Sequence, residues 1–197
     1  MLEWRVCGIR CRLSLLFPAL ITVLLLIRPD GLAVSCLIAS LVHEGGHLSA
    51  MLAVGVPPQK CTLGAFGVRI EWGNTLIGYG QHILVSFAGP LANGLAAAVL
   101  FLLHSPETAA VHMALAVLNL LPAAALDGGE LLRYGMCLLG MEELADMALR
   151  FASALVLLPL SAVSLWLFIG NKNPTLLLVS AYLTVLLFFS EKNEKTS

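Results

Sequence analysis

The stretch His43-Glu44-Gly45-Gly46-His47 decides how this chain is interpreted, because it lies inside an apolar run from residue 32 to residue 56. That run has the length of a membrane-spanning helix, and the motif holds its only acidic, basic or imidazole side chains. Burying a Glu and two His in lipid is costly unless something neutralises or ligates them. An intramembrane cluster of this kind therefore indicates a functional site.

The spacing within this motif predicts a zinc site. On a helix, residues four apart lie one above the other, so His43 and His47 can bind one Zn²⁺ through their imidazole nitrogens. Glu44 follows the first His, where it can act on a water molecule at the metal rather than bind the metal itself. The pattern is typical of zinc-dependent hydrolases, with Glu44 as the general base.

The composition is that of a polytopic membrane protein. Of the 197 residues, 59% are hydrophobic and only 12% are charged, which excludes an ordinary soluble domain. At roughly 20 residues a span, the length allows about six spans. The net charge is -1 and there is no block of like charges, so a nucleic-acid partner is not expected and the lipid bilayer is.

We therefore expect an all-α polytopic fold of about six transmembrane helices. Residues 1–31 are expected to form a first transmembrane helix with its flank, and residues 32–140 a three-span catalytic core. Residues 141–197 are expected to form an amphipathic segment, two more spans and a polar tail. The expected spans are residues 13–27, 32–56, 83–103, 108–139 (interrupted), 151–169 and 175–190. Basic residues gather on one side of these spans, which places both termini in the cytoplasm.

A small β-hairpin or sheet is expected at the membrane surface between the second and third spans, within residues 57–81. Residues 62–72 are Gly-rich and partly alternating, and the turn signal Gly73-Asn74 follows them. An extended edge there could pair with an extended substrate segment, because strand addition supplies backbone hydrogen bonds that lipid cannot. A plain interfacial loop is the alternative.

A catalytic zinc site needs a third protein ligand. Asp127 is the favoured candidate, a carboxylate in apolar surroundings that is followed by Gly128 and Gly129. Pro122 interrupts the same element and removes a helical hydrogen bond, and Asn119 offers amide groups close by. The remaining histidines stay open as alternatives, although His at these positions is more often structural: His82, His104 and His112.

Three motifs, in this order, resemble those of the site-2 protease family of intramembrane zinc metalloproteases. They are His43-Glu44-x-x-His47, Gly89-Pro90-Leu91-Ala92-Asn93, and Asn119-x-x-Pro122 leading to Leu126-Asp127-Gly128. The match covers the core from about residue 32 to residue 139. The resemblance implies one Zn²⁺ per chain, bound by His43, His47 and Asp127, with Glu44 as general base. It also implies that Asn119 and Asn93 help to position the substrate or the active site.

Within that family the chain looks like the sporulation branch, whose members release a mother-cell sigma factor from a membrane-tethered precursor. Residues 57–81 are too few for a PDZ domain, and no CBS domain is expected within the 197 residues. The resemblance implies a sigma-factor precursor or an anti-sigma factor as substrate, and a membrane inhibitor or regulator as a further partner. It also implies the bacterial inner membrane or the forespore-surrounding membrane as the location.

Two other functions fit polar residues inside a membrane. A metal transporter or channel would pass ions and scatter its ligands over several helices. A catalytically silent scaffold would tolerate the loss of Glu44 and bind no stoichiometric zinc. Ligands gathered at one depth, with a base beside one of them, favour hydrolysis over both alternatives.

Overall fold

A computed structural model of the chain describes residues 2–6, 9–14, 31–64, 67–71, 77–124, 126–171 and 180–181. Within these residues the protein is mostly helical and has one four-stranded sheet. The chain divides into two units, Met1–Val117 and Leu118–Ser197. The first and last expected spans, residues 13–27 and 175–190, fall almost entirely outside the described residues.

The sheet belongs to the first unit and has the strand order β1-β2-β3-β4. The pairs β1–β2 and β3–β4 are antiparallel, whereas β2 and β3 run parallel. Glu3 and Arg12 are partners in the β1–β2 register and form an ion pair of 2.8 Å. The strands are Leu2–Val6 (β1), Ile9–Leu13 (β2), Lys60–Gly64 (β3) and Gly67–Glu71 (β4).

The strands expected within residues 57–81 are therefore confirmed, and the sheet also includes β1 and β2, from the stretch that we expected to flank a first span. Residues 2–13 alternate apolar and polar side chains, a pattern typical of strands. Strands β3 and β4 pair from Lys60 with Glu71 to Gly64 with Gly67. The expected turn signal Gly73-Asn74 lies outside the described residues.

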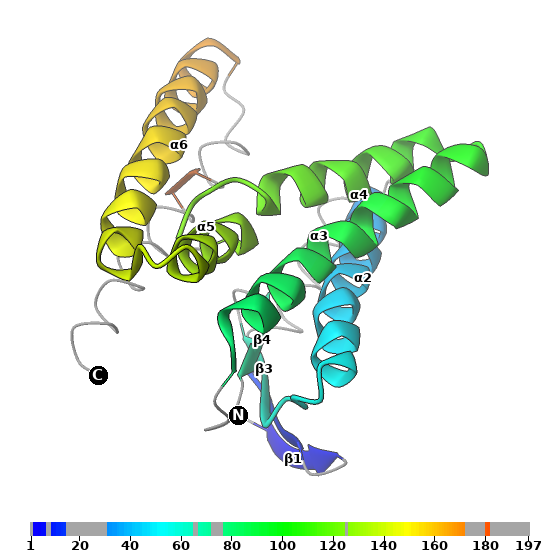
Figure 1. Cartoon of the computed structure of the whole chain (residues 1–197). Coiled ribbons are helices and arrows are strands. Elements are labelled where there is room, and N and C mark those ends of the chain that lie inside the picture. Colours follow the sequence, from blue (N-terminus) through cyan, green and yellow to red (C-terminus); the bar gives the residue numbers. More distant parts are fainter. Residues whose placement is uncertain are drawn as a thin grey trace. The chain divides into compact units, whose positions relative to one another are not determined.

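In the first unit, the helices α2 (Leu32–Ala53) and α3 (Tyr79–Leu102) pack against each other. Gly46 lies so close to the Ala88 carbonyl and the Ala92 side chain that even a methyl group would collide with them. Small residues at such a crossing let two helices approach closely, as they do in membrane proteins. The sheet lies at the end of this pair where α2 ends and α3 begins (Figure 1).

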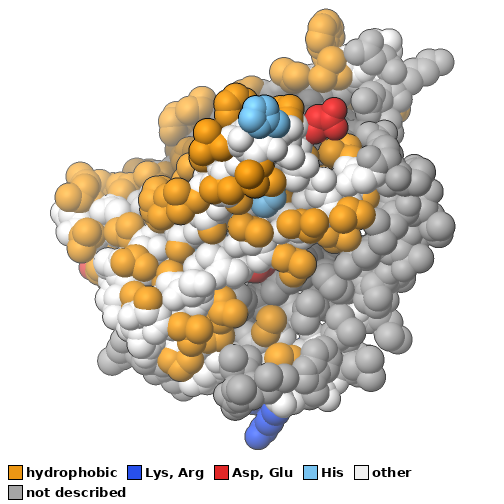
Figure 2. All heavy atoms as spheres, turned by 90° about the vertical axis from the view of Figure 1, so that its right-hand side faces the viewer, with side chains coloured by type: hydrophobic (Ala, Val, Ile, Leu, Met, Phe, Trp, Pro, Cys, Tyr) orange, Lys and Arg blue, Asp and Glu red, His pale blue; other side chains and the backbone are white. Residues whose placement is uncertain are grey.

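Apolar side chains remain exposed along α3 at helical spacing, as a lipid-facing surface requires, and Figure 2 shows many such side chains with few charged groups among them. By length and composition, α3 and α6 (Glu142–Asn171) are the described helices that could cross a membrane. Helix α2 is not among them, because its His-Glu-His motif lowers its hydropathy. The exposed side chains on α3 include Leu84, Phe87, Leu91, Leu95 and Leu102.

The interruption expected within residues 108–139 is present. Helix α4 (Pro106–Asn119) ends before Pro122, and helix α5 begins anew over Asp127–Leu138. The link between them is held by Ser153 of α6, whose hydroxyl accepts a hydrogen bond from the Ala124 N–H at 2.9 Å and donates one to the Leu149 carbonyl at 2.7 Å. Irregular backbone at membrane depth needs partners of this kind within the protein.

Helix α6 runs continuously through residues that we expected to divide into a short amphipathic piece and a separate span beginning at residue 151. No Gly or Pro separates the two stretches, so nothing stops the helix between them. Its polar first part has a structural role of its own, because Asp146 pairs with Arg133 of α5 at 3.1 Å.

Candidate metal centre

The two histidines of the α2 motif have the geometry of a metal-binding pair. Their rings are nearly perpendicular, at 85°, and the Nε2 atoms of His43 and His47 lie 3.2 Å apart. Two nitrogens bound to one tetrahedral Zn²⁺ at about 2.0–2.1 Å would lie roughly 3.3–3.4 Å apart. The spacing of the pair therefore fits zinc without movement of either ring by more than a few tenths of an ångström.

Helix α3 fixes the tautomer of His47. Its Nδ1 lies 2.8 Å from the carbonyl oxygen of Val85, and a carbonyl can only accept a hydrogen bond. The proton of a neutral His47 is consequently on Nδ1, and the lone pair is on the Nε2 that faces His43. This arrangement, in which the outer ring nitrogen donates to a carbonyl, is the usual one for a metal-bound histidine.

On its other side, His43 contacts Asn93, the asparagine of the predicted Gly-Pro-Leu-Ala-Asn motif. The Nδ2 atom of Asn93 lies 3.2 Å from Nδ1 of His43, and its Oδ1 lies 3.0 Å from Nδ1 of His112 on α4. All three side chains are buried, with Asn93 and His112 at 0% and 1% exposure. His112, which we considered as a metal ligand, thus reaches His43 through Asn93.

Gly89 and Pro90, the first two residues of that motif, are buried in α3. A Cβ atom placed on Gly89 would overlap Nε2 and Cε1 of the His47 ring and lie 2.9 Å from the His43 ring. Only glycine leaves room for both imidazoles here, so the motif is explained by its contact with the histidine pair.

Glu44 directly follows His43 on α2 and is half-buried. The charge of its carboxylate acts on a cysteine of the sheet. The pKa of the Cys61 thiol on β3 is raised, first by burial, then by the neighbouring Cys11 thiol and then by the Glu44 carboxylate. Strand β3 therefore lies within electrostatic range of the motif's acidic residue.

Asp127 belongs to the second unit and is the first residue of α5, where the helix N-terminus stabilises negative charge. The two glycines after it are buried, and both pack directly on the preceding link. A Cβ on Gly128 would overlap the Leu120 carbonyl, and a Cβ on Gly129 the Ala123 carbonyl. Pro122 lies in that link, and Asn119 is the last residue of α4.

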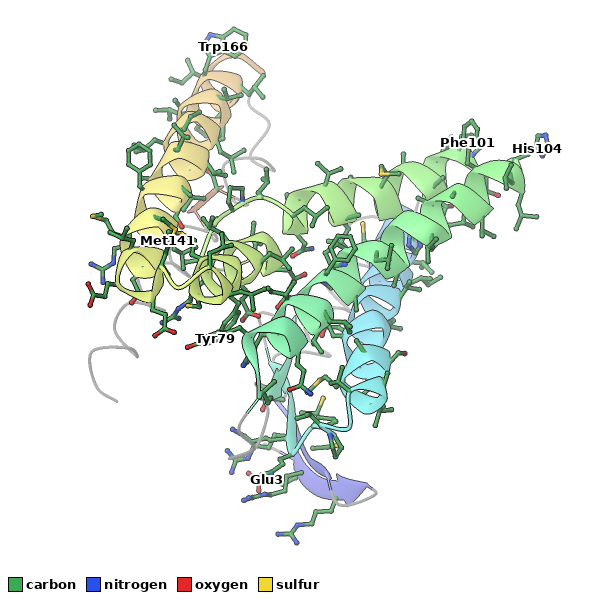
Figure 3. The ribbon with its side chains drawn as sticks, in the orientation of Figure 1. Glu3, Tyr79, Phe101, His104, Met141 and Trp166 are labelled. Carbon is green, nitrogen blue, oxygen red and sulfur yellow. The ribbon has the colours of Figure 1, made fainter. Side chains whose placement is uncertain are left out.

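His43, His47 and Asp127 offer two imidazole nitrogens and one carboxylate oxygen, a group that could hold a metal ion. This donor set suits Zn²⁺ and leaves a fourth position for water or substrate. His104 does not share the centre. It follows the end of α3 that lies away from the sheet (Figure 3), about 22 Å along the helix axis from Gly89. His82 lies in the first turns of α3, about 10 Å from Gly89 on the same scale.

Comparisons with known proteins support the fold. No family model matches the sequence, and no curated protein matches it. Among solved structures, the Site-2 Protease from Methanocaldococcus jannaschii matches with a TM-score of 0.66 at 19% sequence identity. The match covers 92% of this chain and 91% of that one. At this level of identity, the likeness establishes that the two proteins share a fold.

Proposed function

We propose that this chain is an intramembrane zinc metalloprotease of the site-2 protease kind, which hydrolyses a peptide bond in or near a membrane segment of a substrate protein. The observation that carries this proposal is the 3.2 Å separation of the two Nε2 atoms, with Glu44 at the next position on the same helix. The fold shared with the Site-2 Protease from Methanocaldococcus jannaschii and the two apolar helices support it.

In this proposal, His43, His47 and Asp127 hold one Zn²⁺. The donor chemistry fits, because a His-His-carboxylate set with an open fourth position is typical of catalytic rather than structural zinc. A zinc ion bound there would act as a Lewis acid and bring the pKa of a bound water to about 7.

The residues of the chain supply the proton transfers. Glu44 removes a proton from the attacking water as the new C–O bond forms, and delivers it to the amine nitrogen as the peptide C–N bond breaks. Asn119, at the end of α4, is proposed to donate an amide hydrogen bond to the substrate carbonyl oxygen. Asn93 contributes through its contact with His43.

The substrate is proposed to be a membrane-tethered protein that is bound in an extended conformation. A carbonyl in a helix is hydrogen-bonded and shielded, so the substrate must unwind, and helix-breaking residues are expected near its cleavage site. Pairing with an edge of the four-stranded sheet would satisfy its backbone. A sigma-factor precursor or an anti-sigma factor is the first candidate, with a membrane inhibitor or regulator as a further partner.

The test is co-expression of the protein with epitope-tagged, membrane-tethered sigma-factor precursors and anti-sigma factors. Glu44→Gln should reduce cleavage by about 10²- to 10⁴-fold, the usual contribution of a general base, while zinc stays bound. The exposed carboxylate of Glu107, at the start of α4, provides the control Glu107→Gln, which should cleave normally. Cleavage that survives Glu44→Gln would exclude Glu44 as the base, and cleavage that survives removal of zinc would exclude a metalloprotease.

A further inference from the structure

A buried chain of side-chain hydrogen bonds joins three helices of the first unit. It runs from His43 on α2 to Asn93 on α3 and on to His112 on α4, over distances of 3.2 and 3.0 Å. Side-chain pairs of this kind are a small minority of protein hydrogen bonds. Leaving one buried partner unpaired is costly, because its lost hydrogen bond to water is not replaced. The donor and acceptor roles at the three residues are therefore coupled: the choice at one hydrogen bond determines the choice at the other.

Metal binding fixes which ring nitrogen of His43 carries the proton. A neutral histidine that ligates through Nε2 keeps its proton on Nδ1, so Nδ1 of His43 must donate to Asn93. Only the amide oxygen of Asn93 can accept that hydrogen bond. The amide NH₂ then faces His112, whose Nδ1 must accept in turn.

The opposite orientation of the amide blocks the metal. In the structure, Nδ2 of Asn93 is directed at His43, so Nδ1 of His43 accepts and its proton is on Nε2. That Nε2–H can then donate to Nε2 of His47, 3.2 Å away, whose lone pair is fixed by the Val85 carbonyl. A half-turn of the Asn93 amide group about its Cβ–Cγ bond interchanges its oxygen and nitrogen and converts one pattern into the other.

We propose that Asn93 and His112 are positioning residues that set the tautomer of His43 for metal binding, with His112 acting only through Asn93. This inference rests on the proposed zinc site, because it needs His43 as a ligand. His112 suits the role since its Nδ1 can donate or accept as its proton moves between the two ring nitrogens, and so it follows either orientation of the amide. Its burial on α4 keeps competing water away.

The decisive variants are His112→Leu and His112→Asn. The two replacements have nearly the same shape, but only the asparagine amide can pair with Asn93 from the position of Nδ1. The zinc affinity of the full chain, purified in detergent, is measured by competition with a chromophoric chelator. Leu should weaken zinc binding by about 10- to 100-fold, as is usual when the partner of a ligand is lost, and Asn should restore it to within about threefold of the natural protein.

Two further measurements separate positioning from folding. In Co²⁺-loaded protein, His112→Leu should shift the visible absorption bands, which report ligand geometry, while His112→Asn leaves them in place. In an Asn93→Leu background, His112→Leu should weaken zinc no further, because the two residues act in series. If the Leu variant does not fold, His112→Gln replaces it. Its amide lies one bond too far from the backbone, so it should weaken zinc where Asn does not.

The outcomes are distinguishable. Equal zinc affinity and cobalt spectra for the Leu (or Gln) and Asn variants would overturn the inference, as would additive effects of Asn93→Leu and His112→Leu. If the natural protein binds zinc no better than His43→Ala does, the proposed function itself fails, independently of His112.

Discussion

The two units orient the side chains of the proposed metal site by different means. On α2, His43 and His47 lie in the middle of a helix. Their outer nitrogens are held by the Asn93 side chain and by the main-chain carbonyl of Val85, both on α3. In the second unit, Asp127 stands at a helix start whose position is set by backbone packing of the glycines after it. The imidazoles therefore depend on the room and the hydrogen bonds around their rings. The position of the Asp127 carboxylate depends instead on how the backbone of α5 packs against the link that precedes it.

The largest effect is expected where the imidazoles have the least room. In Gly89→Ala, the added methyl group collides with both rings, so zinc binding and cleavage should be lost. Gly94→Ala, on the same helix, has open space around its Cβ and should be neutral or stabilising by about 0.5–1 kcal/mol. Zinc content, cleavage and thermal stability of the two variants provide the test. Equal behaviour of the pair would show that Gly89 does not shape the site.

The matching experiment in the second unit uses α5. Gly128→Ala should force the start of the helix away from the Leu120 carbonyl and displace Asp127, lowering zinc affinity together with stability. Gly135→Ala, with nothing near its Cβ, should retain both. If Gly128→Ala binds zinc as tightly as Gly135→Ala, backbone packing does not position the carboxylate.

The smallest effect concerns the Cys61 thiol. Because the Glu44 carboxylate raises its pKa, Glu44→Gln should lower that pKa and increase the thiolate fraction at a given pH. Alkylation of Cys61 by iodoacetamide near pH 8, followed by peptide mass spectrometry, should then be faster by a few-fold at most. Glu107→Gln should not change the rate. An unchanged alkylation rate in Glu44→Gln would show that the Glu44 carboxylate does not affect the pKa of the Cys61 thiol on β3.

Patterns that are local in the sequence predicted much of the fold and site. The four-residue spacing of His43 and His47 predicted their shared face, and Pro122 predicted the break between α4 and α5. Glycine-rich alternation predicted the strands within residues 57–81. In each case, backbone sterics or helix periodicity act over a few residues.

What the sequence did not reveal depends on contacts between distant residues. The parallel pairing of β2 with β3 joins Arg10 to Lys60, and nothing near residue 10 indicates that partner. The link from His112 to Asn93 and on to His43 is likewise invisible until α2, α3 and α4 are packed. A histidine within an apolar helix is only a weak sign of such a role, because many buried histidines are structural.

The central claim is that Asp127 shares one zinc ion with His43 and His47. It is tested most directly by measuring the zinc content and zinc affinity of purified Asp127→Asn beside Glu44→Gln. The account predicts about one zinc per chain in the natural protein and in Glu44→Gln. For Asp127→Asn it predicts a loss of affinity beyond the roughly 10- to 100-fold that follows removal of a merely supporting residue. Undiminished zinc affinity in Asp127→Asn would contradict the claim and move the third ligand elsewhere.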